Sequence, residues 1–243
     1  MVADAACVKQ ARVPLEFGCM NLLAIDTSTD SCSVAASRGR DLFSRREPAL
    51  QRQAERVLGM VDEVLAEAKL DLAQIEGIAY GQGPGSFTGL RIAAGVTQGL
   101  ALARGLGVVG VGSLLALAEE AAAEEVVACL DAHMDEVYHA AYRRAGAAWE
   151  EISAPGLYKP EAVPVPSGED WMGCGDAFAV HRDRLAARVG DHVSVVRSDV
   201  GPTARAVLRL AIPRFAAGEA KDAATAVPVY LRDKVAKKTS ERT

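Results

Sequence analysis

The residues best suited to chemistry stand at the end of the first apolar run, in Ala24-Ile-Asp-Thr-Ser-Thr29. An aspartate at a strand end, followed by hydroxyl side chains on a tight turn, is one arrangement that holds phosphate oxygens. Such turns usually carry a glycine so that the backbone can approach the anion, but none stands between Asp26 and Asp30. The missing glycine favours a structural hairpin over a nucleotide site that would use Asp26 and Thr27.

A glycine-rich turn, Gly81-Gln-Gly-Pro-Gly85, separates a predicted strand from a predicted helix. Free backbone N–H groups and the helix dipole favour an anion at such a place. The turn lacks the Lys-Ser/Thr pair of a Walker loop, and it does not match the dinucleotide G-x-G-x-x-G spacing with a downstream acid. Gly83 and Gly85 are therefore ligand candidates, but the pattern favours a structural or interface role for them.

No set of side chains points to a hydrolytic centre. The helix predicted over 50–69 contains no histidine, so it offers no His-x-x-x-His pair for zinc. His133 and His139 share one side of a predicted strand, but six residues of strand hold them roughly 20 Å apart. No Gly-x-Ser-x-Gly elbow occurs. We expect no catalytic residue and no metal site, and we interpret Asp131 and Glu136 as solvated or capping residues.

The helix predicted over Ser86–Arg104 is apolar nearly all round, and Arg91 is its one charged residue before Arg104. Gly95 and Gly99 are four residues apart, so they share a face and permit close backbone approach. A helix of this kind must be covered on more than one side, by its own domain or by another subunit. We predict a subunit interface that it shares with the helix at 50–69, formed by Ala54, Leu58, Val61, Phe87, Leu90, Arg91, Ala94, Gly95, Val96 and Gly99.

Apolar runs and turn residues predict the elements that position these groups. Three short strands within 21–46 read as an antiparallel meander. Strand and helix then alternate, at 50–69, Ile75–Tyr80, Ser86–Arg104 and Gly107–Val111. A meander followed by this alternation is typical of a ribonuclease-H-like unit, whose mixed sheet has parallel later strands.

The second half repeats this order more loosely. Val126–Asp131 is an apolar run that ends in Asp, as the first strand does. The later predicted elements are strands at Glu136–Arg143, Ala148–Ser153, Trp171–Cys174 and Val193–Val196, a loop at 155–170, and helices at Ala177–Val189 and Thr203–Ala217.

We divide the chain into four parts. Residues 1–19 are predicted to be a disordered or non-native extension, because regular patterning begins after them. Residues 20–121, with a returning helical segment over about 203–232, form domain I, and 122–202 form a smaller, degraded domain II. The charged segment 233–243 is predicted to be a flexible tail.

Composition excludes several classes of protein. The chain has 243 residues and a net charge of −5, with no interior basic cluster, which argues against direct binding to a phosphate backbone. Its five cysteines are odd in number, widely spaced and without C-x-x-C, which fits a reducing cytoplasm. No apolar run reaches the length of a membrane span. We expect a soluble cytoplasmic protein.

Together these motifs resemble the TsaB family, also called YeaZ. The resemblance covers the chain from Met20 to about Ala236, and its second segment is highly specific. It rests on Ala24-Ile-Asp-Thr-Ser-Thr29, Gly83-Pro-Gly-Ser-Phe-Thr-Gly-Leu-Arg-Ile92, Asp131-Ala-His-Met-Asp-Glu-Val-Tyr138 and Pro228-Val-Tyr-Leu-Arg232.

The resemblance implies an α/β protein with two ribonuclease-H-like lobes, as in the actin/Hsp70/sugar-kinase superfamily. It also implies membership of the complex that installs threonylcarbamoyl on adenosine next to the anticodon of tRNA. In that family the catalytic paralogue TsaD holds the metal and the nucleotide, and the ATPase TsaE joins the pair. TsaB-like proteins pair with TsaD and also self-associate as homodimers, and contact with tRNA is indirect.

Two places in the chain depart from the family pattern. Gln51, Arg52 and Gln53 stand where relatives often carry His, which weakens any residual metal site. His133 stands where Arg commonly follows Asp-Ala, so no cation role is carried over there. We expect a partner subunit without turnover or cofactor of its own, with ATP bound only weakly or at the partner interface. The alternatives are a nucleotide-dependent small-molecule kinase of the same superfamily and a glycoprotease-like peptidase.

Overall fold

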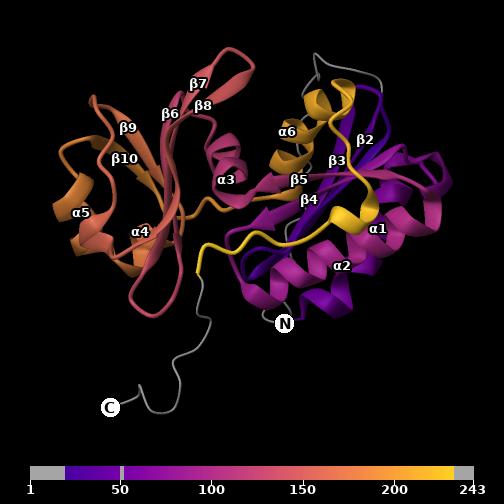
Figure 1. Ribbon diagram of the computed structural model, residues 1–243, viewed down its shortest axis with the longest axis horizontal. Coiled ribbons are helices and arrows are strands. Elements are labelled where there is room, and N and C mark those ends of the chain that lie inside the picture. The colour runs from indigo at the N-terminus through magenta and orange to yellow at the C-terminus, as the bar shows by residue number, and fades with distance from the viewer. Residues whose placement is uncertain (1–19, 50–51, 233–243) are drawn as a thin grey trace, which may run out of the picture.

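A computed structural model of the chain describes residues 20–49 and 52–232. Within them the chain forms two lobes, each built on one five-stranded sheet (Figure 1). The predicted extension at 1–19, the predicted tail at 233–243 and residues 50–51 lie outside the described residues.

The first sheet has the strand order β3-β2-β1-β4-β5. β1 pairs antiparallel with β2 and parallel with β4, so Ile25 lies between Val34 and Tyr80. β2 pairs antiparallel with β3, and β4 pairs parallel with β5. This is the mixed sheet predicted from the meander and the alternation that follows it. Its strands are β1 (Leu22–Asp26), β2 (Ser31–Arg38), β3 (Asp41–Pro48), β4 (Gly77–Gly83) and β5 (Gly107–Gly112).

Helices cover both faces of this sheet, and the buried central strand shows why. Successive side chains of a strand point to opposite faces. Leu23 and Ile25 pack with the residues of α1 and α2, whereas Leu22 and Ala24 pack with those of α6. The residues of the first sheet with these three helices are called lobe I below. The helices are α1 (Gln53–Ala68), α2 (Phe87–Arg104) and α6 (Ala204–Ala216).

The second sheet repeats the order of the first, as β8-β7-β6-β9-β10. β6 pairs antiparallel with β7 and parallel with β9, in the same way as β1 pairs with β2 and β4. The sheet with α4 and α5 is called lobe II. Its elements are β6 (Glu125–Asp131), β7 (Val137–Ala145), β8 (Ala148–Tyr158), β9 (Trp171–Cys174), β10 (Val193–Arg197), α4 (Ala177–Val180) and α5 (Arg182–Val189).

One helix, α3 (Ser113–Ala121), lies between the lobes (Figure 1). Leu114 and Leu117 pack against the inner face of the second sheet, and α3 also contacts α6. Phe178 and Leu185 of α4 and α5 cover the outer face of that sheet. The order of layers is therefore α1 and α2, first sheet, α6 with α3, second sheet, α4 and α5. The predicted fold class is confirmed.

Three predicted elements were wrong in extent. β8 continues to Tyr158, inside the predicted loop at 155–170, because it pairs with β7 down to Val137. The helix predicted over Ala177–Val189 is broken at His181, whose φ of −115° is not helical. β4 runs on into the glycine-rich turn, because parallel pairing with β5 continues to Gly83.

The chain returns to lobe I after lobe II. α3 ends at Ala121, β6 begins at Glu125, and α6 packs on the first sheet. A short 3-10 helix, η3 (Ala223–Thr225), then starts a segment that runs along α2. Residues Ala223–Arg232 are called the C-terminal segment below. A domain is defined by its ability to fold independently. The domain boundaries at 121/122 and 202/203 therefore stay a prediction.

Among the described residues, no helix combines the length and the apolar character needed to cross a bilayer.

Candidate functional site

The β1–β2 hairpin keeps its polar side chains inside the protein. Asp26, Thr27 and Ser28 are at most 2% exposed. Ser28 Oγ donates to Asp26 Oδ1 at 3.0 Å, and the Ser28 N–H donates to the same oxygen at 3.3 Å. Thr27 Oγ1 donates to the carbonyl of Gly89 at 2.7 Å, which ties the hairpin to the first turn of α2. The hydroxyl groups of Thr27 and Ser28 are therefore engaged in internal hydrogen bonds, whereas Thr29 is half-buried.

The carboxyl group of Asp26 is packed against the backbone of the glycine-rich turn. A Cβ added at Gly81 would lie 1.9 Å from Asp26 Oδ2, so only glycine fits there. Burial raises the pKa of Asp26, while the hydrogen bonds from Ser28 and the charge of Arg46 act in the opposite direction. A buried carboxyl group of this kind is a poor partner for a hydrated cation.

The glycines of the turn make close backbone contacts. Gly83 has a φ of +112°, and a Cβ there would lie 2.6 Å from the carbonyl oxygen of Val229. A Cβ at Gly85 would lie 2.2 Å from the carbonyl oxygen of Ser28. Gly83 is therefore needed both for its φ and for its contact, and Gly85 for its contact. The sequence signalled the glycines, but not the segments that they touch.

A cleft of about 340 Å³ lies between the lobes, at the turns of the two equivalent hairpins. Of the four weak cofactor candidates, Gly85 lines this cleft, whereas Asp26, Thr27 and Gly83 do not. The β6–β7 turn supplies its far wall. Within the described residues, no three His, Cys, Asp or Glu side chains are grouped so that they could hold a metal ion.

Asp131 organises the far wall of the cleft. Its carboxylate lies 2.9 Å from His133 Nδ1 and 3.1 Å from His181 Nε2, and its backbone N–H donates to Asp176 Oδ1 at 2.8 Å. His181 is thus held at the break between α4 and α5. Glu136 pairs with Arg232 at 2.5 Å. Asp131 and Glu136 are therefore both engaged in ion pairs or hydrogen bonds.

α1 and α2 lie together on the outer face of the first sheet (Figure 1). The residues predicted for a partner interface divide there into two groups. Val61, Leu90 and Ala94 are at most 4% exposed and belong to lobe I itself, so they are corrected to core positions. They point toward the sheet because they share the inward stripe of their helices. The others are exposed or half-buried, namely Ala54, Leu58, Phe87, Arg91, Gly95, Val96 and Gly99.

The exposed side of α2 is nearly free of charge. Gly95 and Gly99 are exposed, and a Cβ at either position would meet nothing within 4 Å. Leu102, three residues further along the same face, is 62% exposed, and Leu58 of α1 is 52% exposed. Leu102 is absent from the predicted interface, although its i+7 spacing from Gly95 could have identified it. We call Leu58, Gly95, Gly99 and Leu102 the outer helix face.

Arg91, the one charged residue of α2 before Arg104, is tied to the C-terminal segment. The guanidinium of Arg91 lies 3.8 Å from the centre of the Phe87 ring, and its Nε donates to Tyr230 Oη at 3.0 Å. The rings of Phe87 and Tyr230 are 5.4 Å apart between centroids. Arg91 and Phe87 therefore border the outer helix face and hold the C-terminal segment in place.

The fold defines the class of this protein. Two lobes with the same ribonuclease-H-like strand order, joined across inner helices, form an α/β protein with the two-lobed arrangement of the actin/Hsp70/sugar-kinase superfamily.

The comparisons with known proteins give the family within that class. A family model described as TsaD, tRNA N6-adenosine threonylcarbamoyltransferase, matches residues 47–240. The tRNA threonylcarbamoyladenosine biosynthesis protein TsaB of Escherichia coli (strain K12) is 37% identical over 229 residues, which are 89% of this chain and 96% of that protein. The solved structure of YeaZ from Pseudomonas aeruginosa has a TM-score of 0.81 at 38% identity, and the match covers 87% of this chain and 100% of that one. The chain belongs to the TsaB (YeaZ) family.

Proposed function

We propose that this chain is a non-catalytic subunit in the formation of threonylcarbamoyladenosine next to the anticodon of tRNA. It acts by binding a TsaD-like catalytic paralogue. The names of the TsaB relatives support a role in threonylcarbamoyladenosine formation. The match to the TsaD family model supports descent of this chain and of TsaD from a common two-lobed ancestor.

The observation that carries this proposal is the outer helix face. Two glycines with open space above them let a partner backbone approach α2 closely. Leu58 of α1 and Leu102 of α2 add exposed apolar surface. Burying such surface stabilises a complex by roughly 25 cal/mol per Å², partly offset by the cost of association. A face without charge at its centre is suited to another protein and not to an anionic ligand.

The hairpin supports a role without turnover. The side chains of Asp26, Thr27 and Ser28 hydrogen-bond one another and α2, and the glycine-rich turn is filled by backbone contacts. Little remains in this chain alone to hold the phosphates of a nucleotide. ATP would then bind weakly, or at an interface shared with the catalytic paralogue.

The same reasoning extends to the other partners. A TsaE-like ATPase would join the pair as a third protein. The outer helix face would form a homodimer when the paralogue is absent, since exposed apolar surface favours self-association. The net charge of −5 disfavours independent binding to tRNA, so contact with tRNA would be indirect.

The test is a pair of substitutions on the outer helix face, Gly95→Arg and Leu102→Asp. Gly95→Arg replaces glycine by a better helix former in open space, so the fold should be kept while close approach is blocked. Binding to the TsaD-like paralogue, measured by calorimetry and by co-purification from the native cell, should weaken at least about tenfold in each variant. Val96 is less suitable because it is half-buried against the core.

Ala187→Arg is the matched control, because Ala187 is an exposed residue of a lobe II helix. It should leave the affinity unchanged. Circular dichroism and thermal unfolding should be the same for all three variants. Wild-type affinity in both Gly95→Arg and Leu102→Asp would rule out this face as the docking surface.

A further inference from the structure

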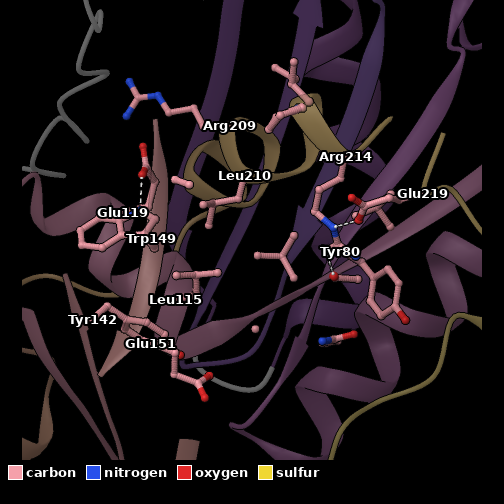
Figure 2. A pocket seen from close by; sticks show the side chains of 18 of the residues that line it. Tyr80, Leu115, Glu119, Tyr142, Trp149, Glu151, Arg209, Leu210, Arg214 and Glu219 are labelled. Carbon is pink, nitrogen blue, oxygen red and sulfur yellow. Dashed lines mark hydrogen bonds and ion pairs between the residues drawn. The ribbon is translucent and has the colours of Figure 1, made fainter. Parts of the chain in front are cut away.

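A second cavity, of about 730 Å³, shares no lining residue with the interlobe cleft. It lies between β5 and α6 on one side and the β7–β8 ribbon on the other (Figure 2). Its volume falls in the range of roughly 300–1,000 Å³ that is typical of small-molecule sites. No residue of the outer helix face contributes to it, so the proposed docking of a partner leaves it without a role.

The middle of the cavity is apolar. Leu115 of α3 and Leu210 of α6 lie between the aromatic side chains of the ribbon and the Arg214–Glu219 pair (Figure 2). Val109 and Pro213 add to this surface. A ligand that enters the cavity would therefore bury an apolar body.

The ribbon supplies a rigid aromatic wall. The rings of Tyr142 and Trp149 stand edge to face, with centroids 6.5 Å apart. Trp149 Nε1 donates to Glu119 Oε2 at 2.9 Å, and the guanidinium of Arg144 lies 4.0 Å from the centre of the Trp149 ring. The hydrogen bond to Glu119 and the contact with Arg144 fix the position of the indole ring. A flat group could therefore stack on the indole without a rearrangement of this side chain.

The cavity also holds a cation that makes no direct ion pair with the described residues. Arg144 pairs with Glu119 at 3.0 Å, and Arg214 pairs with Glu219 at 2.9 Å. Arg209 is half-buried and has no hydrogen bond or ion pair to any residue of 20–49 or 52–232. Burial lowers the pKa of Arg209, and the positive charges of Arg205 and Arg144 act in the same direction, while the carboxylates of Glu119 and Glu120 act against them. An anion beside it would offset this cost.

Arg209 and the aromatic wall lie at the same end of the cavity. The negative charge of Glu119 raises the pKa of Arg209, and the same carboxylate accepts the hydrogen bond from Trp149. A ligand that stacks on the indole would lie on the side of the cavity that Arg209 lines (Figure 2). A guanidinium without a direct ion pair prefers planar oxyanions such as carboxylate or phosphate.

We propose that the cavity between α6 and the β7–β8 ribbon binds a small planar anion. Its apolar ring packs against Trp149, Tyr142 and Leu210, and its carboxylate or phosphate group accepts hydrogen bonds from Arg209. This site is separate from the partner interface and from the interlobe cleft.

Three probes of one shape test the charge preference, namely 2-naphthoate, 2-naphthylmethylamine and 2-naphthylmethanol. The chain has two tryptophans, so its ¹H–¹⁵N spectrum contains two indole signals, which Trp149→Phe assigns. Titration with 2-naphthoate should shift the Trp149 signal to saturation. The Trp171 signal should stay in place, because that ring is fully buried in the other core of lobe II.

Arg209→Gln keeps a polar side chain of similar length and removes the charge. It should weaken 2-naphthoate binding at least about fivefold and leave binding of the alcohol unchanged. Arg182→Gln, on α5 and outside the cavity, is the matched control and should bind like the wild type.

Three results would overturn the proposal. The first is no saturable shift of the Trp149 signal with 2-naphthoate. The second is equal or tighter binding of the amine, because the cavity would then not select an anion. The third is unchanged 2-naphthoate affinity in Arg209→Gln. Loss of partner binding is not among the readouts, so this test and that of the proposed function fail independently.

Discussion

At the scale of single residues, Asp26 shows how environment decides the role of a reactive group. Its position after a strand and before three hydroxyl residues suits phosphate chemistry. In the folded chain the carboxyl group accepts hydrogen bonds from Ser28 and packs on Gly81. Its pKa is raised by burial, with no ion pair to a cation among the described residues. Asp26 therefore acts as a structural residue of the hairpin.

This role makes a prediction about pH. Because the folded state raises the pKa of Asp26 above the ordinary 3.8, it binds the proton more tightly than the unfolded chain. The stability from this proton is complete below pH 3.8 and is lost as the pH rises through the folded pKa. Asp26→Asn has no such proton, so its free energy of unfolding should rise relative to the wild type as the pH increases above about 4.

Urea unfolding followed by circular dichroism at several pH values measures this difference. Binding of the TsaD-like paralogue should be retained in Asp26→Asn, because the outer helix face is untouched. A nucleotide-dependent enzyme that used Asp26 would instead lose its activity in this variant. The same pH dependence in both proteins would contradict the structural role.

At the scale of elements, the start of α6 joins parts of the chain that are far apart in sequence. Thr203 Oγ1 accepts from the Ala206 N–H at 3.1 Å and donates to Glu120 Oε2 of α3 at 2.7 Å. Ser33 Oγ of β2 accepts from the Ala204 N–H at 2.8 Å. The side chain of Thr203 thus caps one helix and attaches it to another.

Thr203→Ala should lower the free energy of unfolding by about 1–2 kcal/mol, because it removes the cap and leaves a buried N–H without that partner. Thr203→Ser keeps the hydroxyl group and should retain most of the stability. Urea unfolding of both variants at neutral pH checks the difference. Equal losses would assign the effect to the methyl group of Thr203 and not to its hydrogen bonds.

At the scale of the whole molecule, the C-terminal segment links the lobes. The Val229 N–H donates to the Gln82 carbonyl at 2.7 Å, and the Tyr80 hydroxyl donates to the Val227 carbonyl at 3.2 Å. Three residues after Val229, Arg232 pairs with Glu136 of lobe II. The segment therefore leaves lobe I and ends on the rim of the cleft (Figure 1).

Arg232→Ala should loosen this attachment. Hydrogen–deuterium exchange of the backbone amides of Val227 and Val229 should become faster, because local opening no longer breaks an ion pair. Exchange in the β1–β4 core should not change. Arg197→Ala removes an exposed pair with Asp199 at 3.0 Å and is the control. Unchanged exchange in Arg232→Ala would show that the contacts with Tyr80 and Gln82 are sufficient.

The type of most elements and their order along the chain could be predicted from local patterns of residues. The spacing of apolar residues, the turn residues and the glycines are local signals. They were sufficient to predict the antiparallel meander, the alternation of helices and strands after it, and the repetition of this order in the second half of the chain. They were also enough to select α2 as an unusual helix. The predicted end of a strand was wrong where pairing with another strand set it. One such end is that of β8, where Tyr158 pairs with Val137 of β7.

Which residues are exposed to a partner or a ligand depends on the folded structure. Val61, Leu90 and Ala94 have the same apolar character as Leu102, but they face the sheet and Leu102 faces solvent. Arg209 and Trp149 are 60 residues apart, and nothing in their local patterns relates them. Exposure and proximity depend on how distant segments pack together, and that packing is set by the sum of many contacts and not by any one motif.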